Sequence, residues 1–158
     1  SLGFGLFGMV WAVWSVLHIT LIKILPEGTA LLFYLLLVIS FSDIFAYFGG
    51  KRFGKSLLAP NISPKKTWEG SFFGVVGGGI VGAVFGELTM SMFWLYGLVL
   101  AMLLAVVGQL GDLVESKIKR LCDVKDSGTL LPGHGGILDR IDGHMLAAPV
   151  FYYLLQLG

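Results

Sequence analysis

Long apolar runs dominate this sequence and limit what it can fold into. A helix needs about 20 mostly apolar residues to cross a bilayer. Five runs approach or reach that length: Leu2–Ile22, Thr29–Phe48, Ser71–Gly86, Met92–Leu110 and the shorter Met145–Leu157. We therefore expect an all-α fold, a polytopic bundle of transmembrane helices with about five spans.

The composition agrees with a membrane protein. Only 13% of the 158 residues are charged and the mean hydropathy is +0.84, whereas soluble domains average about 25% charged residues. The 23 glycines suit transmembrane helices that pack closely. The net charge of +1 says nothing about partners, and one cysteine, Cys122, excludes an intramolecular disulfide.

Two polar stretches, Gly49–Gly70 and Gly111–Gly143, interrupt the apolar runs. Two spans lie between them, so both stretches should face the same side of the membrane. Ten of the eleven Lys and Arg residues fall in these stretches, and only Lys23 lies elsewhere. Because cytoplasmic loops carry an excess of basic residues, we expect two cytoplasmic polar loops.

The segment from Ser116 to Asp142 concentrates charge around a Pro-Gly-His-Gly-Gly turn. Charge beside a bilayer is costly and usually marks a site. Asp112 and Asp139 are candidate ligands for Mg²⁺, which binds few protein carboxylates together with substrate phosphates. The alternative is that each pairs with a neighbouring cation, Asp112 with Lys119 or Asp139 with Arg140.

The cations of this segment offer two interpretations. Lys119, Arg120, Lys125 and Arg140 could neutralise substrate phosphates, or they could anchor the chain at anionic headgroups. Anchoring explains the sign of the charge but not the interleaved carboxylates. His134 could act in the site or be a satisfied turn histidine.

Helical spacing relates several polar residues. Asp112, Glu115, Ser116 and Lys119 would share one face of a helix that continues the fourth apolar run past the membrane surface. Asp43 lies near the cytoplasmic end of the second run. An ionisable residue there should face the bundle interior.

The first polar stretch carries weaker signals. Its glycines and lysines could cradle a phosphate, the hydroxyls of Ser63 and Thr67 could bind it, and the Asn61 amide could read a base or ribose. The sequence is not a Walker A motif. From the residues alone, a surface loop with basic anchors and Trp68 in the interfacial aromatic belt is favoured.

The run S-x-x-K-R-x-x-x-x-K-D-x-x-x-x-x-P-x-H-G-G-x-x-D-R-x-D, from Ser116 to Asp142, resembles the signature of the phosphatidate cytidylyltransferases. The run Ser63–Gly70 and the upstream Asp43 also look like that family. The resemblance implies an enzyme of phospholipid synthesis that uses CTP and phosphatidate, makes CDP-diacylglycerol and pyrophosphate, and requires Mg²⁺. The family is also associated with a monovalent cation, with K⁺ as the candidate.

The resemblance also implies roles for individual residues. Asp112 and Asp139 would bind the metal. The catalytic group would comprise Lys119, Arg120, Lys125, Asp126, His134, Arg140 and Asp142. The substrate-binding group would comprise Asp43, Asn61, Ser63, Lys65, Lys66 and Ser116. Residues 1–158 would be the C-terminal transmembrane catalytic portion of a longer protein, since the family extends further at its N-terminus.

Two other functions compete with this interpretation. A CTP-dependent polyprenol kinase has partly similar polar loops but would transfer the γ-phosphoryl group. A transporter fragment could line an ion path with Asp43, Asp112 and the glycine-rich third run. For the favoured function we expect an integral protein of the cell inner membrane with its active site facing the cytoplasm. The expected partners are CTP, phosphatidate and membrane lipid, with no nucleic acid; a homodimer is left open.

Overall fold

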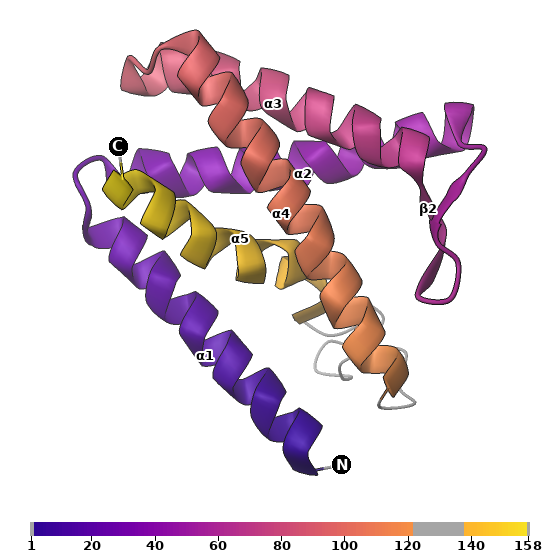
Figure 1. The fold of residues 1–158 in the computed structure, drawn as a ribbon. Coiled ribbons are helices and arrows are strands. Elements are labelled where there is room, and N and C mark those ends of the chain that lie inside the picture. The colour runs from indigo at the N-terminus through magenta and orange to yellow at the C-terminus, as the bar shows by residue number, and fades with distance from the viewer. Residues whose placement is uncertain (1, 122–137, 158) are drawn as a thin grey trace.

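The computed structural model describes the backbone of residues 2–121 and 138–157 and the side chains of residues 10–121 and 143–157. Five helices and one small hairpin make up these segments (Figure 1). In chain order they are α1 (Leu2–Ile24), α2 (Gly28–Phe53), β1 (Leu57–Ala59), β2 (Ser63–Thr67), α3 (Trp68–Met90), α4 (Trp94–Leu121) and α5 (Leu138–Leu157).

The helical membrane fold expected from the sequence is confirmed in its main features. Within the described segments, α2, α3 and α4 are long and apolar enough to cross a membrane. Within the same described segments, α1 contributes a shorter apolar helix, Val10–Ile24. α5 is 20 residues long and carries Pro149 inside it.

One element of the first polar stretch departs from the expected all-α fold. Residues 57–67 form an antiparallel hairpin in which Leu57 pairs with Thr67 and Ala59 pairs with Ser63. The helices on either side also enter this stretch, because α2 continues to Phe53 and α3 begins at Trp68. The first polar stretch is therefore a partly exposed hairpin between two helices, and Trp68, expected in the interfacial belt, is 62% exposed.

Glycines at four-residue intervals let α3 lie directly against its neighbours. A Cβ added at Gly74 would come within 2.7 Å of the Ser42 carbonyl oxygen on α2. A Cβ at Gly82 would come within 2.3 Å of the Ala101 Cβ on α4. In a bilayer, where apolar burial gives no advantage over lipid, such close backbone contact is a main source of helix association.

The buried core joins α2, α4 and α5. Tyr34, Leu104 and Phe151 are fully buried, and the Tyr34 and Phe151 rings stack with centroids 5.8 Å apart. The Tyr34 hydroxyl donates to the Gly97 carbonyl oxygen at 2.6 Å. This bond satisfies the polar end of a side chain that is otherwise in an apolar environment.

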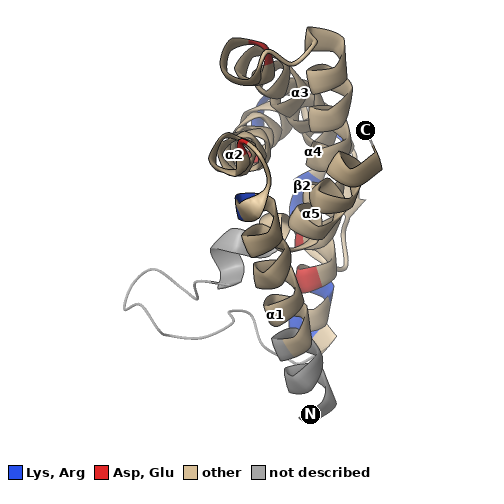
Figure 2. Cartoon of the chain, turned by 90° about the vertical axis from the view of Figure 1, so that its left-hand side faces the viewer, with Lys and Arg blue, Asp and Glu red and all other residues tan. Residues whose placement is uncertain are grey.

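The described parts of the two polar stretches lie at the same end of the bundle. The hairpin and the C-terminal part of α4 meet there, whereas the α1–α2 and α3–α4 connections lie at the other end (Figure 1). The view onto this second end is mostly tan, since Lys, Arg, Asp and Glu colour only short segments (Figure 2). The fold therefore gathers charge from two distant segments at one end.

Candidate functional site

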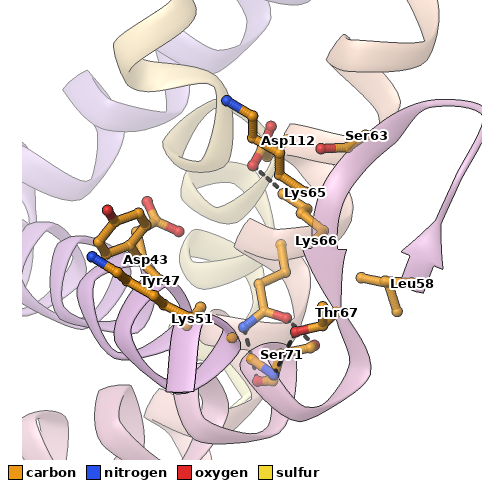
Figure 3. A pocket seen from close by; sticks show the side chains of 14 residues that line it. Asp43, Tyr47, Lys51, Leu58, Ser63, Lys65, Lys66, Thr67, Ser71 and Asp112 are labelled. Carbon is orange, nitrogen blue, oxygen red and sulfur yellow. Dashed lines mark hydrogen bonds and ion pairs between the residues drawn. The ribbon is translucent and has the colours of Figure 1, made fainter. Parts of the chain in front are cut away.

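A cavity of about 410 Å³ lies at the polar end, between α2, the hairpin and the C-terminal half of α4 (Figure 3). Acidic, basic and hydroxyl side chains face it from elements that are far apart in sequence. The lining residues are Asp43, Ala46, Tyr47, Gly50, Lys51, Leu58, Ser63, Lys65, Lys66, Thr67, Gly70, Ser71, Gln109 and Asp112. Five residues predicted for the site from sequence are therefore brought together: Asp43, Ser63, Lys65, Lys66 and Asp112.

One wall of the cavity is a single face of α2. Asp43, Tyr47 and Lys51 line it, and their four-residue spacing places them one above the other on the helix. Asp43, which from sequence should face the bundle interior, thus lines the cavity. Lys51, which from sequence is better explained as a basic anchor, also belongs to this wall (Figure 3).

The opposite wall comes from β2 and α4. The Lys66 ammonium forms an ion pair with Asp112 Oδ2, and both side chains are 28% exposed. The other carboxylate oxygen, Oδ1, accepts a hydrogen bond from Ser116 Oγ at 3.3 Å. Asp112 does pair with a cation, but with Lys66 rather than with Lys119, which lies 3.3 Å from Glu115 instead.

The helical face predicted for residues 112–119 is confirmed. α4 continues to Leu121, and the pairs Asp112–Ser116 and Glu115–Lys119 form at the expected i, i+4 spacing. The helix therefore carries Asp112 and Ser116 to the polar end of the bundle in a fixed orientation.

A hydrogen-bonded group that the sequence analysis missed lies beside the cavity. Gln109 Nε2 donates to Ser42 Oγ at 3.3 Å and to the Ser71 carbonyl oxygen at 3.2 Å. Ser71 Oγ donates to Gln109 Oε1. One side chain of α4 is thus bonded to both α2 and α3, one turn before Asp112. A glutamine inside an apolar helix requires partners, and this signal was available in the sequence.

Two side-chain-to-backbone interactions attach the hairpin and the residues just before it to α3. Thr67 Oγ1 accepts from Gly70 N at 3.1 Å, so it is the N-cap of α3. Glu69 Oε2 accepts from the backbone N–H groups of Lys55 and Ser56 at 3.1 and 3.3 Å. Thr67, considered from sequence as a phosphate-binding hydroxyl, is already used by the fold.

Other predicted residues are not placed in the cavity. Asn61 is exposed in the turn between β1 and β2, and Arg120 is exposed at the end of α4; neither lines the cavity. Lys125, Asp126 and His134 lie outside the described residues. Asp139, Arg140 and Asp142 lie in the first turns of α5, but their side chains are outside the described part.

The donors in the cavity fit a hard divalent cation. Among the described residues, no three His, Cys, Asp or Glu side chains gather as a metal cluster. Two carboxylates, Asp43 and Asp112, nevertheless line the same cavity. Mg²⁺ is usually held by one or two carboxylates, with substrate phosphates and water completing its coordination.

Comparison with known proteins finds relatives that match most of this chain. A phosphatidate cytidylyltransferase of Bacillus subtilis is 47% identical over 131 residues, which cover 82% of this chain and 49% of the relative. One of Brucella abortus is 43% identical over 151 residues, or 92% of this chain and 54% of the relative. One of Synechocystis is 48% identical over 117 residues, or 73% of this chain and 40% of the relative.

The chain spans about half the length of the curated relatives it matches. The sequence profile of the cytidylyltransferase family matches residues 1–158. The resemblance seen in the two polar segments therefore extends over the whole chain, and the chain belongs to the cytidylyltransferase family.

Proposed function

We propose that the protein transfers CMP from CTP to phosphatidate, producing CDP-diacylglycerol and pyrophosphate. The observation that carries this proposal is the cavity itself, which brings Asp43, Lys51, Lys65, Lys66 and Asp112 together at the polar end of an apolar bundle. The activity is the one named for the relatives in Bacillus subtilis and Brucella abortus.

The proposed metal ligands are Asp112 and Asp139, and Asp43 is a further carboxylate that lines the same cavity as Asp112. When bound, Mg²⁺ would neutralise the polyphosphate and polarise its phosphoryl oxygens. K⁺ remains a proposal from the family resemblance alone. The chain's own part is to hold oxygen donors at the place where the phosphates arrive.

The reaction needs positioning and charge neutralisation more than covalent help from the protein. An oxygen of the phosphatidate phosphate attacks the α-phosphorus of CTP, and the bond to the β-phosphate oxygen breaks to release pyrophosphate. The attacking phosphate is already a competent nucleophile, so no general base is required. Lys65 and Lys66, which line the cavity on β2, would stabilise the negative charge of the phosphates.

The α2 wall suits the lipid substrate. Lys51 lines the cavity, while Ile44 and Phe48 on the same helix are 46% and 62% exposed. A phosphatidate molecule could therefore keep its acyl chains in the bilayer beside α2 and present its phosphate to Lys51 and Tyr47. CTP would enter from the water on the same side.

The cavity is proposed to face the cytoplasm from the cell inner membrane. CTP is made in the cytoplasm, and all Lys and Arg residues except Lys23 belong to the two polar stretches. We assign Lys125, Asp126, His134 and Arg140 to the proposed site from the family resemblance alone.

Product analysis with two labels tests the proposed function. The purified protein in detergent is given phosphatidate, Mg²⁺ and CTP labelled at either the α- or the γ-phosphate. The proposal requires the α-label in the lipid product and the γ-label in pyrophosphate. A γ-label in the lipid, with release of CDP, would identify a kinase, and no lipid labelling would leave the transporter interpretation.

A further inference from the structure

We propose that Lys66 is an exchangeable counter-ion for Asp112. Its ammonium pairs with the carboxylate oxygen that a metal would use, and it would move to a substrate phosphate when the metal–nucleotide complex binds. This inference rests on the proposed function, because it assigns a role to one lysine of the proposed site.

The state of Asp112 is the first observation. Both of its carboxylate oxygens already have partners, Oδ2 with Lys66 and Oδ1 with Ser116 Oγ. A metal ion and an ammonium group cannot share one carboxylate oxygen without strong repulsion between the two cations. Metal binding at Asp112 Oδ2 therefore requires Lys66 to leave.

The position of Lys66 is the second observation. The side chains of Lys66 and Asp112 are equally exposed, at 28%. Both residues line the cavity and are therefore accessible to a ligand that enters it. Lysine carries a compact charge on a flexible four-carbon stem with three rotatable donors. After release, the ammonium can stay in the same cavity and meet the phosphates that accompany the metal.

This exchange would serve two needs of the site. A half-buried carboxylate is costly if no cation faces it, and the ion pair with Lys66 removes that cost before a metal binds. Once displaced, the same lysine adds positive charge where the polyphosphate binds. Metal and nucleotide would then favour each other's binding, and by linkage the effect is reciprocal.

A permanent structural tie is the competing explanation for the ion pair. In that case Lys66 holds β2 against α4, and its removal would loosen the site and weaken metal binding. The exchange model predicts the opposite sign, because removing Lys66 takes away a competitor of the metal. The sign of the change in metal affinity therefore separates the two explanations.

The test measures Mn²⁺ binding to the purified protein by electron paramagnetic resonance, without nucleotide and therefore without turnover. Lys66→Met should tighten Mn²⁺ binding by about tenfold, the effect of losing one charge-assisted hydrogen bond to the ligand oxygen. Lys65→Met is the matched control, since it removes an equal charge from the same cavity lining and strand. It should change the affinity by no more than about twofold, because an exposed charge in high dielectric acts weakly at a distance.

The outcomes distinguish this inference from the proposed function. Equal changes in the Lys65 and Lys66 variants, or weaker Mn²⁺ binding by Lys66→Met, would overturn the exchange role while leaving the metal site intact. Lys66→Arg keeps the charge and should retain nearly wild-type Mn²⁺ affinity. That result would show that replacing residue 66 does not by itself disrupt the fold. Failure of the wild-type protein to bind Mn²⁺ even with CTP would overturn the metal site itself.

Discussion

Gly143 of α5 lies against Gly108 of α4, so closely that a Cβ added at Gly143 would be 3.3 Å from the Gly108 carbonyl oxygen. The two helices run in opposite directions (Figure 1). Asp112 follows Gly108 by four residues, and Asp139 precedes Gly143 by four residues. Each is about 6 Å along its helix from the contact, and both lie toward the polar end.

This placement leads to a prediction about Asp139. If the two aspartates bind one metal ion, Asp139→Asn should weaken Mn²⁺ binding by at least about tenfold, because a charged ligand is replaced by a neutral one of the same size. Electron paramagnetic resonance of the purified variant measures this directly. Glu87→Gln, at the other end of the bundle, is the control for loss of one negative charge. Unchanged affinity in Asp139→Asn would remove this residue from the metal site.

Close packing of α3 gives a prediction about stability. In Gly82→Ala the new Cβ would lie 2.3 Å from the Ala101 Cβ, and such overpacking costs about 1–3 kcal/mol. For a chain of this size each kcal/mol lowers Tm by about 2–4 °C. Thermal unfolding in detergent, followed by circular dichroism, measures the loss.

Gly97→Ala is the matched control for that measurement. Gly97 is also a buried helical glycine, but the nearest atom to an added Cβ, the Ala83 Cα, is at an ordinary 3.4 Å. Its Tm should stay the same or rise, since alanine is the better helix former. Equal losses in the two variants would contradict the packing explanation.

Part of this architecture could be predicted from the sequence because its signals are local and periodic. Apolar runs predict the helices, and i, i+4 spacing predicts the Asp112–Ser116 pair. The hairpin could not be predicted, because Ser63–Thr67 contains a proline and two lysines and has low strand propensity. Its strands are fixed instead by their attachment to α3 through Thr67 and Glu69.

The site was predicted less completely, for a related reason. The motifs identify Asp112, Lys65 and Lys66, but the place of Lys51 depends on how far α2 extends beyond the apolar run. Sequence hydrophobicity ends that run at Phe48, whereas the helix continues to Phe53. A glutamine within an apolar run shows that Gln109 needs partners, but which two helices supply them depends on tertiary packing.

The α2 wall gives a prediction about the lipid substrate. Lys51→Gln should raise KM for phosphatidate by about tenfold, through loss of a charged contact to the acceptor phosphate. The KM for CTP should change little. Lys117→Gln, an exposed cation at the same end of the bundle that does not line the cavity, is the control in a mixed-micelle assay. Equal effects in the two variants would show that Lys51 is only a headgroup anchor.

The proposed orientation is tested by labelling from each side of the membrane. In a Cys122→Ser background, cysteines introduced at Lys55 and Lys117 should react with an impermeant reagent only from the cytoplasmic side. A cysteine at Glu87 should react only from the opposite side. All three native residues are exposed. Labelling of positions 55 and 117 from different sides would refute the shared-face topology.

The central claim is that cytidylyl transfer takes place in the cavity around Asp112, and turnover of Asp112→Asn tests it most directly. The rate of CDP-diacylglycerol formation from α-labelled CTP is measured at saturating substrates, with circular dichroism confirming the fold. We expect a loss of at least about 10²-fold, the effect of removing one preorganised charged group from a reacting site. A folded Asp112→Asn protein with near-wild-type turnover at limiting Mg²⁺ would contradict the account.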